Sequence, residues 1–165
     1  FNFSWEIKAT KLTDGTLNFV LTPPPQWKPS PNIRVNFDEV LQNSLLMVKS
    51  KQLGKQVESI TASDYKVLSG LDAQGIGIAD LSCLKQATNL KMLHLANNRI
   101  SDLRPLENLA ELDKLYLINN PITDIQPLGT LTKLVRLTIG PANIENHGPL
   151  AKLTNLRMIH PESET

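Results

Sequence analysis

Leucine and isoleucine recur with a period of 22 residues through the C-terminal part of the chain. One column of the pattern holds Leu68, Leu90, Leu112, Leu134 and Leu156. Six further columns keep the same register, and their members are Leu71, Leu93, Leu115, Leu137 and Ile159; Ala73, Leu95, Leu117, Ile139 and Pro161; Ile78, Ile100, Ile122 and Ile144; Leu81, Leu103 and Ile125; Leu84, Leu106, Leu128 and Leu150; and Ala87, Leu109, Leu131 and Leu153. A period held over this length predicts a stack of repeats, in which each unit buries its apolar side against the next.

Each unit opens with the pattern L-x-x-L-x-L, which predicts a short strand whose alternate side chains point inward. One such strand cannot bury its apolar side alone, so successive strands are expected to stack as a parallel sheet. Asn98 and Asn120 follow two of these strands, and their amides are expected to bond the loop backbone that leaves the sheet. The prolines that recur on the returning segment, where they fix φ and remove a hydrogen-bond donor, are Pro105, Pro127 and Pro149. The convex side is therefore predicted to hold short 3₁₀ or single-turn helices.

The full repeat pattern, L-x-x-L-x-L-x-x-N-x-I-x-D-[LI]-x-P-L-x-x-L, resembles the repeats of internalin-like bacterial leucine-rich-repeat proteins. Residues 90–133 match it almost letter for letter, and residues 68–165 match it more loosely. The resemblance implies an α/β fold, namely a leucine-rich-repeat solenoid of about five rungs over residues 68–165. Its curved parallel sheet is expected to have a short 3₁₀ or irregular convex side.

Residues 36–69 carry two helix start signals ahead of the array. Asn36 stands three residues before Glu39, which is the spacing of a capping box, and Thr61 offers a second start. The apolar residues that share one face of the first helix are Val40, Leu41, Leu45 and Val48. The order of these motifs resembles the helical N-terminal cap of internalin-like proteins, which implies that the segment seals the first repeat strand and binds nothing.

Residues 1–35 are predicted to form a β-hairpin appendage followed by a proline-rich linker. A three-residue loop that ends on a left-handed Gly15 pairs Ala9 with Phe19. The same loop pairs Ile7 with Leu21, whereas a two-residue loop would place Lys8 opposite Leu21. One hairpin is marginal alone, so it either packs on the helical cap or is the remnant of a preceding β-domain. The prolines of residues 23–31 predict a semi-rigid spacer. The alternating apolar residues of the two strands are Phe3, Trp5, Ile7, Ala9, Leu17, Phe19 and Leu21.

The pattern degrades towards the C-terminus. Ala142 stands at the turn asparagine position, His147 at an apolar convex position and Pro161 at an inward strand position. Because proline blocks further strand pairing, residues 156–165 are predicted to form an edge strand that ends the array, or to mark the point where a longer array was cut. The chain starts at Phe1 without a methionine, so we expect a processed form or an excised fragment.

The inner, concave face of the sheet is expected to stay open, because the repeat is too short to supply helices for both faces. Tyrosine and arginine are frequent in binding hot spots, and methionine suits adaptable surfaces. We therefore predict a protein-binding patch centred on Tyr116, against the alternative of scattered surface residues. Its members are Met92, His94, Lys114, Tyr116, Ile118, Arg136, Thr138, Met158 and His160.

Neither a metal site nor a catalytic site is predicted, and no cofactor is expected. His94 and His160 lie three rungs apart, about 14 Å at about 4.8 Å per strand, and neither has a carboxylate or a cysteine at ligand spacing. Cys83 has no histidine in register and is interpreted as a small semi-buried residue. The carboxylates that recur on the convex turns, interpreted as bonding local backbone N–H groups rather than as a calcium ladder, are Asp80, Asp102 and Asp124.

Composition narrows the classes of function. The 165 residues carry a net charge of +1 without a basic run, so nucleic acid is not an expected partner. No apolar run is long enough to predict a membrane span, and the single cysteine allows no internal disulfide.

We expect a non-enzymatic, monomeric module that binds a partner protein. The resemblance implies a bacterial secreted or cell-surface protein whose partner is a host or cell-envelope protein. Two alternatives stay open: a cytosolic scaffold or regulatory subunit that docks an enzyme, and a fragment of an enzyme or glycan-binding protein whose active domain is missing.

Overall fold

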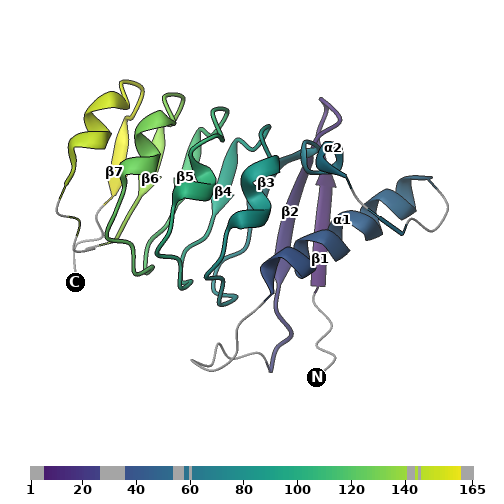
Figure 1. Ribbon diagram of the computed structural model, residues 1–165. Helices are drawn as coiled ribbons and strands as arrows, with labels where there is room; N and C mark the ends of the chain where they lie inside the picture. Colours follow the sequence, from purple (N-terminus) through teal and green to yellow (C-terminus); the bar gives the residue numbers. More distant parts are fainter. Residues whose placement is uncertain are drawn as a thin grey trace.

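Within the described residues, seven strands form one sheet in chain order (Figure 1). The computed structural model describes residues 6–26, 36–53, 58–59, 61–140, 144 and 146–160, and of residues 47–48, 51–53 and 158–160 it describes the backbone alone. The strands are β1 (Glu6–Lys11), β2 (Leu17–Thr22), β3 (Leu68–Asp72), β4 (Met92–His94), β5 (Lys114–Tyr116), β6 (Arg136–Thr138) and β7 (Met158–His160). Strands β3 to β7 are parallel, one from each repeat, as the 22-residue period predicts.

Several predictions fall outside the described residues. They concern Phe3, Trp5, residues 27–35 of the proline-rich segment, Ala142 and Pro161. The same holds for the side chains of Val48, Met158 and His160.

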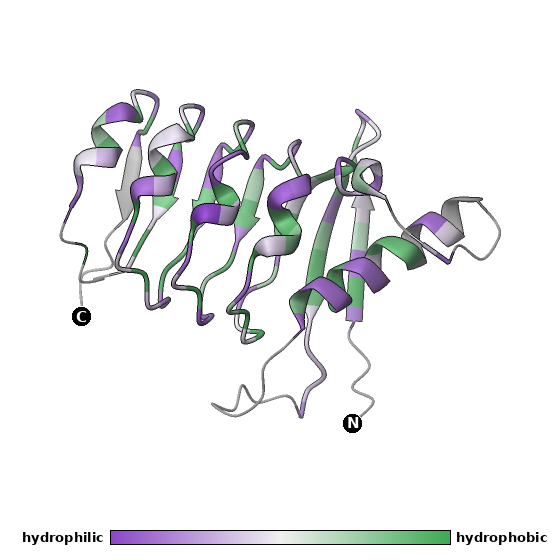
Figure 2. Ribbon diagram, in the orientation of Figure 1, coloured by the Kyte–Doolittle hydropathy of each residue, from purple (hydrophilic) through white to green (hydrophobic). Residues whose placement is uncertain are grey.

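Short 3₁₀ helices return the chain along the convex side, as predicted (Figure 1). They are η1 (Ser82–Gln86), η2 (Arg104–Leu106), η3 (Gln126–Thr130) and η4 (Gly148–Lys152). The apolar columns fill the space between strands and turns: Leu90, Leu93 and Leu95 of one rung are all completely buried. Figure 2 shows apolar residues returning at the same place from rung to rung.

The repeated aspartates start the 3₁₀ helices by bonding local backbone. Backbone N–H groups two residues on donate to Oδ1 of Asp80, Asp102 and Asp124 at 2.8, 2.9 and 2.8 Å. Asn146 takes the same role in the next unit, accepting from the N–H of Gly148 at 2.8 Å. The predicted local role of this column is confirmed, because each side chain satisfies a donor that a short helix leaves unpaired.

Two asparagine amides, which we call the asparagine ladder, each join a rung to the one before it. Oδ1 of Asn98 accepts from the backbone N–H groups of Gly77 and Ile78, at 2.9 and 3.0 Å. Its Nδ2 donates at 2.9 Å to the carbonyl oxygens of Ala73 and Leu95. The amide thus uses both ends to satisfy backbone groups that turn away from the sheet, as predicted.

Asn120 repeats this arrangement one rung later. Its Oδ1 accepts from the N–H of Ile100 at 3.0 Å, and its Nδ2 donates to the carbonyl oxygen of Leu117 at 2.9 Å. The residue before each ladder asparagine, Asn97 or Asn119, has a φ of 57° or 56°, a left-handed conformation that asparagine tolerates better than most residues. Nδ2 of Asn119 donates to Oδ1 of Asn97 at 2.8 Å, which adds an outer step to the ladder.

Replacing Asn98 with alanine should lower the free energy of unfolding by about 3 kcal/mol. The buried N–H groups of Gly77 and Ile78 would lose their acceptor, and each unsatisfied buried group costs about 1–3 kcal/mol. Urea denaturation measures the loss. The matched control is Asn108→Ala at an exposed position, which should stay within about 0.5 kcal/mol of wild type. Equal unfolding midpoints for the two variants would contradict the role of the ladder.

The N-terminal hairpin has the predicted register and loop. Ala9 pairs with Phe19 and Ile7 with Leu21. The N–H of Leu12 donates to the carbonyl oxygen of Thr16 at 2.8 Å across the loop. Gly15 has a φ of 84°, so a residue without a Cβ is needed there.

The hairpin does not stand apart from the repeats, because β2 pairs in parallel with β3. Phe19 lies opposite Leu71 and Val20 opposite Asp72. Phe19 is 1% exposed and belongs to the same core as the repeat leucines. The sequence allows the hairpin either to pack on the helical cap or to be the remnant of a preceding β-domain. In the structure, the hairpin forms the first two strands of the repeat sheet.

The helices of the cap are α1 (Phe37–Leu53) and α2 (Ala62–Tyr65). The N–H of Glu39 donates to Oδ1 of Asn36 at 3.2 Å, which confirms the predicted N-cap. Leu41 and Leu45 are buried in the common core with the hairpin. Helix α1 lies on the same side of the sheet as the 3₁₀ helices, in front of β1 and β2 (Figure 1), so it covers the convex side where no repeat does.

Removing the Phe19 ring should destabilise the whole array, because the hairpin shares its core. We expect Phe19→Ala to lower the free energy of unfolding by about 3–5 kcal/mol in a single cooperative transition. The neighbouring Val20 faces the other side of the sheet, so Val20→Ala should change it by less than about 0.5 kcal/mol. A thermal or urea transition unaltered by Phe19→Ala would show that the hairpin is not part of the cooperative unit.

Candidate functional site on the concave face

Strand register brings most of the predicted site residues together in two rows across the strands. The first row is Asp72, His94, Tyr116, Thr138 and His160. The second row is Gly70, Met92, Lys114, Arg136 and Met158. Ile118 follows β5 and is half-buried. The side chains of Met158 and His160 lie outside the described residues, so only their backbone register is known.

Side chains of the first row contact one another across rungs. Nδ1 of His94 lies 3.4 Å from Oδ1 of Asp72. On its other side the His94 ring lies 5.1 Å from the Tyr116 ring, centroid to centroid, with the planes tilted by 59°. Aromatic pairs at this separation attract each other, so the two rings form a fixed, half-exposed platform.

Asp72 is not among the predicted site residues, although it precedes His94 in the same column. The prediction that neither His94 nor His160 has a carboxylate at ligand spacing is wrong for His94, because Asp72 lies beside it. The pair is not a metal site by itself. Among the described residues no group of three or more histidine, cysteine, aspartate or glutamate side chains could hold a metal ion.

The hairpin extends both rows beyond the repeats. Val20 lies beside Asp72 and Asn18 beside Gly70. Val20 is 39% exposed and is the one exposed large hydrophobic residue in the described part of the chain. Asn18 lies so close over Gly70 that a Cβ there would come within 2.3 Å of its Oδ1, which accounts for the glycine. The period of 22 carries no signal for these two residues, because they precede the array.

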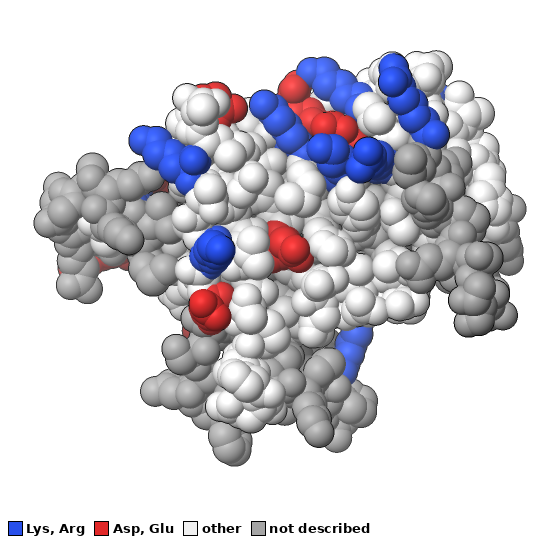
Figure 3. Space-filling view, turned by 180° about the vertical axis from the view of Figure 1, so that it is seen from behind, with Lys and Arg blue, Asp and Glu red and all other residues white. Residues whose placement is uncertain are grey.

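Charged side chains gather along one edge of this face, where the repeat strands begin (Figure 3). Among those at or near the starts of β4 to β7, the basic residues are Lys91, Lys114, Lys133, Arg136 and Arg157, and the acidic ones are Glu111 and Asp113. We call this set the basic rim. The residues that follow the strands, Gln74, Ala96, Ile118 and Gly140, are uncharged. Along β4 to β6 the face is therefore charged where the strands begin and uncharged just after they end.

Comparison with known proteins agrees with this architecture. A family model described as leucine-rich repeats in two copies matches residues 88–129. The crystal structure of internalin C2 from Listeria monocytogenes is 35% identical over 58% of this chain, with a TM-score of 0.57. That of an internalin, inlF, from the same organism is 30% identical over 78% of this chain, with a TM-score of 0.61. This chain is an internalin-like leucine-rich-repeat protein.

The internalin-like chain spans 42% of the length of the internalin C2 structure and 39% of that of inlF. No curated protein sequence matches it. Leucine-rich-repeat domains are protein–protein interaction modules. Within the described residues, no helix has both the length and the apolarity to cross a membrane.

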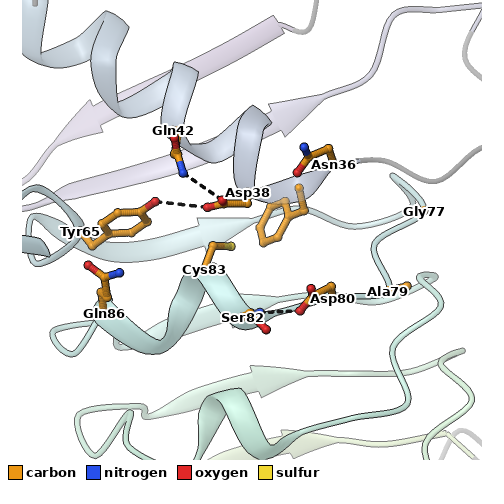
Figure 4. Close-up of a pocket in the computed structure, with 11 residues that line it drawn as sticks. Asn36, Asp38, Gln42, Tyr65, Gly77, Ala79, Asp80, Ser82, Cys83 and Gln86 are labelled. Carbon is orange, nitrogen blue, oxygen red and sulfur yellow. Dashed lines mark hydrogen bonds between the residues drawn. The ribbon is translucent and has the colours of Figure 1, made fainter. Parts of the chain in front are cut away.

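Away from the concave face, a cavity of about 510 Å³ lies between α1 and η1 (Figure 4). Its carboxylates are engaged by neighbouring groups: Asp38 accepts from Nε2 of Gln42 at 2.9 Å and from the hydroxyl of Tyr65 at 3.4 Å. Asp80, on the other wall, caps η1. The Asp38 bonds join α1 to α2 within the cap, and the Asp80 bond lies within the first repeat, so we assign the cavity walls a structural role.

Cys83 lines the same cavity and is 8% exposed, more buried than the semi-buried position predicted for it. Burial, helped by the nearby Asp38 and Asp80 carboxylates, raises the pKa of its thiol to about 12. Burial and Asp38 likewise raise the pKa of Tyr65 to about 12. Because the thiolate is the nucleophilic form, Cys83 is unsuited to nucleophilic catalysis near neutral pH.

These two raised pKa values predict a loss of stability at high pH. Both groups are neutral when protonated, and their ordinary pKa values are 9.0 for Cys83 and 10.0 for Tyr65. Their contribution is therefore fully present below about pH 9 and is lost as the pH rises towards about 12. We expect Tm, followed by circular dichroism, to fall over this range, and to fall less steeply in Cys83→Ala. Parallel curves for the two proteins would contradict the burial of the thiol.

Proposed function

We propose that this protein binds a partner protein through its concave face, with the His94–Tyr116 platform at the centre of the contact. The observation that carries the proposal is a tilted, half-exposed aromatic pair on a parallel sheet face that no helix of the described part of the chain covers. Parallel sheets are usually buried on both faces, so an open one with aromatic residues is suited to receive another molecule. Rigid aromatic side chains lose little conformational freedom on binding, which is why they are frequent in hot spots.

The neighbours of the platform support the same proposal. Val20 extends the row on the hairpin side, and Ile118 adds apolar surface where β5 ends. Met92, Lys114, Arg136 and Thr138 surround the pair through the strand register. We include Met158 and His160 in the proposed surface because their backbone continues both rows onto β7.

We further propose that the protein is secreted by, or displayed on the surface of, a bacterium, and that its partner is a host or cell-envelope protein. The likeness to the two Listeria internalins supports this setting.

The double variant His94→Ala with Tyr116→Ala should abolish partner binding while the protein stays folded. Removing a cross-strand pair from an open face costs about 1 kcal/mol or less, so Tm should change little. The matched control is Lys85→Ala with Glu107→Ala, two exposed positions on the convex turns. Proteins captured from host-cell and envelope extracts would be quantified by mass spectrometry for wild type and both variants. A partner retained equally by all three proteins would place binding away from the concave face.

A further inference from the structure

The basic rim of the concave face holds more positive charge than its own carboxylates neutralise. Nζ of Lys133 lies 2.6 Å from Oε1 of Glu111, which is a close ion pair. Nζ of Lys114 is 3.9 Å from Oδ2 of Asp113, at the outer limit for such a contact. Lys91 reaches Asp14 in the hairpin loop at 3.7 Å. The carboxylates at and beside the rim are therefore paired with its lysines.

The two arginines of the rim lack an acidic partner among the described residues. Arg136 is exposed and makes no ion pair with any residue that the structure describes, and the same is true of Arg157. Arg104 on the convex side gives the contrast, because its Nη2 lies 2.7 Å from Asp102. The convex arginine is satisfied within the chain, whereas the two concave ones are available to another molecule.

Arg136 lies beside the apolar platform. It pairs in register with Lys114, and Tyr116 stands two positions after Lys114 on the same face of β5. Residues two apart on a strand are about 7 Å apart, so one short segment of a partner could span the guanidinium and the tyrosine ring. A guanidinium binds a carboxylate through two parallel N–H···O bonds, a geometry that lysine cannot offer.

We propose that the partner segment seated on this face is acidic and carries an apolar side chain. A carboxylate would bind Arg136, with Lys114 beside it, and the apolar side chain would lie on His94, Tyr116 and Ile118. This inference rests on the proposed function, since it names the chemistry of the partner that the concave face receives.

A protein segment fits these observations better than a sulfated polysaccharide. The carboxylates of Asp14, Glu111 and Asp113 alternate with the cations of the rim and would repel a uniformly anionic polymer. The apolar platform next to the rim would also have no counterpart on such a polymer. A segment with one or two carboxylates and a large apolar residue matches both parts of the surface.

Selection of a random dodecamer peptide library on the immobilised protein tests the proposal. The enriched peptides should combine an excess of aspartate and glutamate with at least one aromatic or large aliphatic residue. Their synthetic forms, titrated by fluorescence anisotropy, should bind more weakly as sodium chloride is raised. Arg136→Gln should weaken them about tenfold, which corresponds to the loss of one strong charged contact. Lys133→Gln, a loss of the same charge from a side chain already paired with Glu111, should weaken them less than about twofold.

Each other outcome has a separate meaning. Neutral or basic peptides that need His94 and Tyr116 would overturn the acidic partner but leave the concave face as the binding surface. Acidic peptides that lose affinity with Arg136→Gln yet bind the His94→Ala and Tyr116→Ala double variant normally would overturn the apolar part of the contact and the proposed function with it. Heparin that binds more tightly than the peptides and displaces them would assign the rim to a polysaccharide. Failure to enrich any peptide would overturn the acidic segment, whereas a partner that wild type captures and the His94→Ala and Tyr116→Ala double variant loses would leave the proposed function standing.

Discussion

A strand of three residues buries too little apolar surface to be stable alone, so every rung of this protein depends on its neighbours. The dependence is clearest at Asn98, whose amide hydrogen-bonds to backbone groups of its own rung and of the rung before it. Loss of this side chain would leave buried donors and acceptors unpaired in two units at once. The constant spacing of 22 residues follows from this constraint, because an amide shifted by one position could not reach both sets of partners.

The same dependence explains how the array begins. The first repeat strand, β3, would expose both its backbone edge and its apolar side if nothing preceded it. The hairpin supplies the missing partner, since β2 pairs with β3 and buries Phe19 in the common core. The outer strand, β1, then forms the edge of the sheet. It carries Glu6, Lys8 and Lys11, and charges on an edge strand disfavour pairing with further chains.

The cavity beneath α1 and the concave face differ in how their polar groups are used. In the cavity beneath α1, Asp38 accepts hydrogen bonds from Gln42 and Tyr65, so its carboxylate holds α1 and α2 of the cap together. On the concave face, His94 and Tyr116 remain half-exposed and Arg136 has no ion-pair partner in the described part of the chain. Groups that are satisfied internally stabilise the fold, and groups that are not can contribute to binding. This difference is why the proposed contact lies on the open face.

The sequence by itself determined the rungs: the strands, the asparagine ladder, the aspartates that start the 3₁₀ helices, and the rows of the concave face. All of these features recur with the 22-residue period, so their positions in one rung predict their positions in the next. The tertiary structure alone decided that the hairpin joins the sheet, where Ser69 bonds Asn18 across 51 residues of chain. It also decided that Asp72 contacts His94 and that Arg136 makes no ion pair with any described residue of the rim. These contacts depend on lateral pairing between unrelated segments and on side-chain rotamers, neither of which a repeat period encodes.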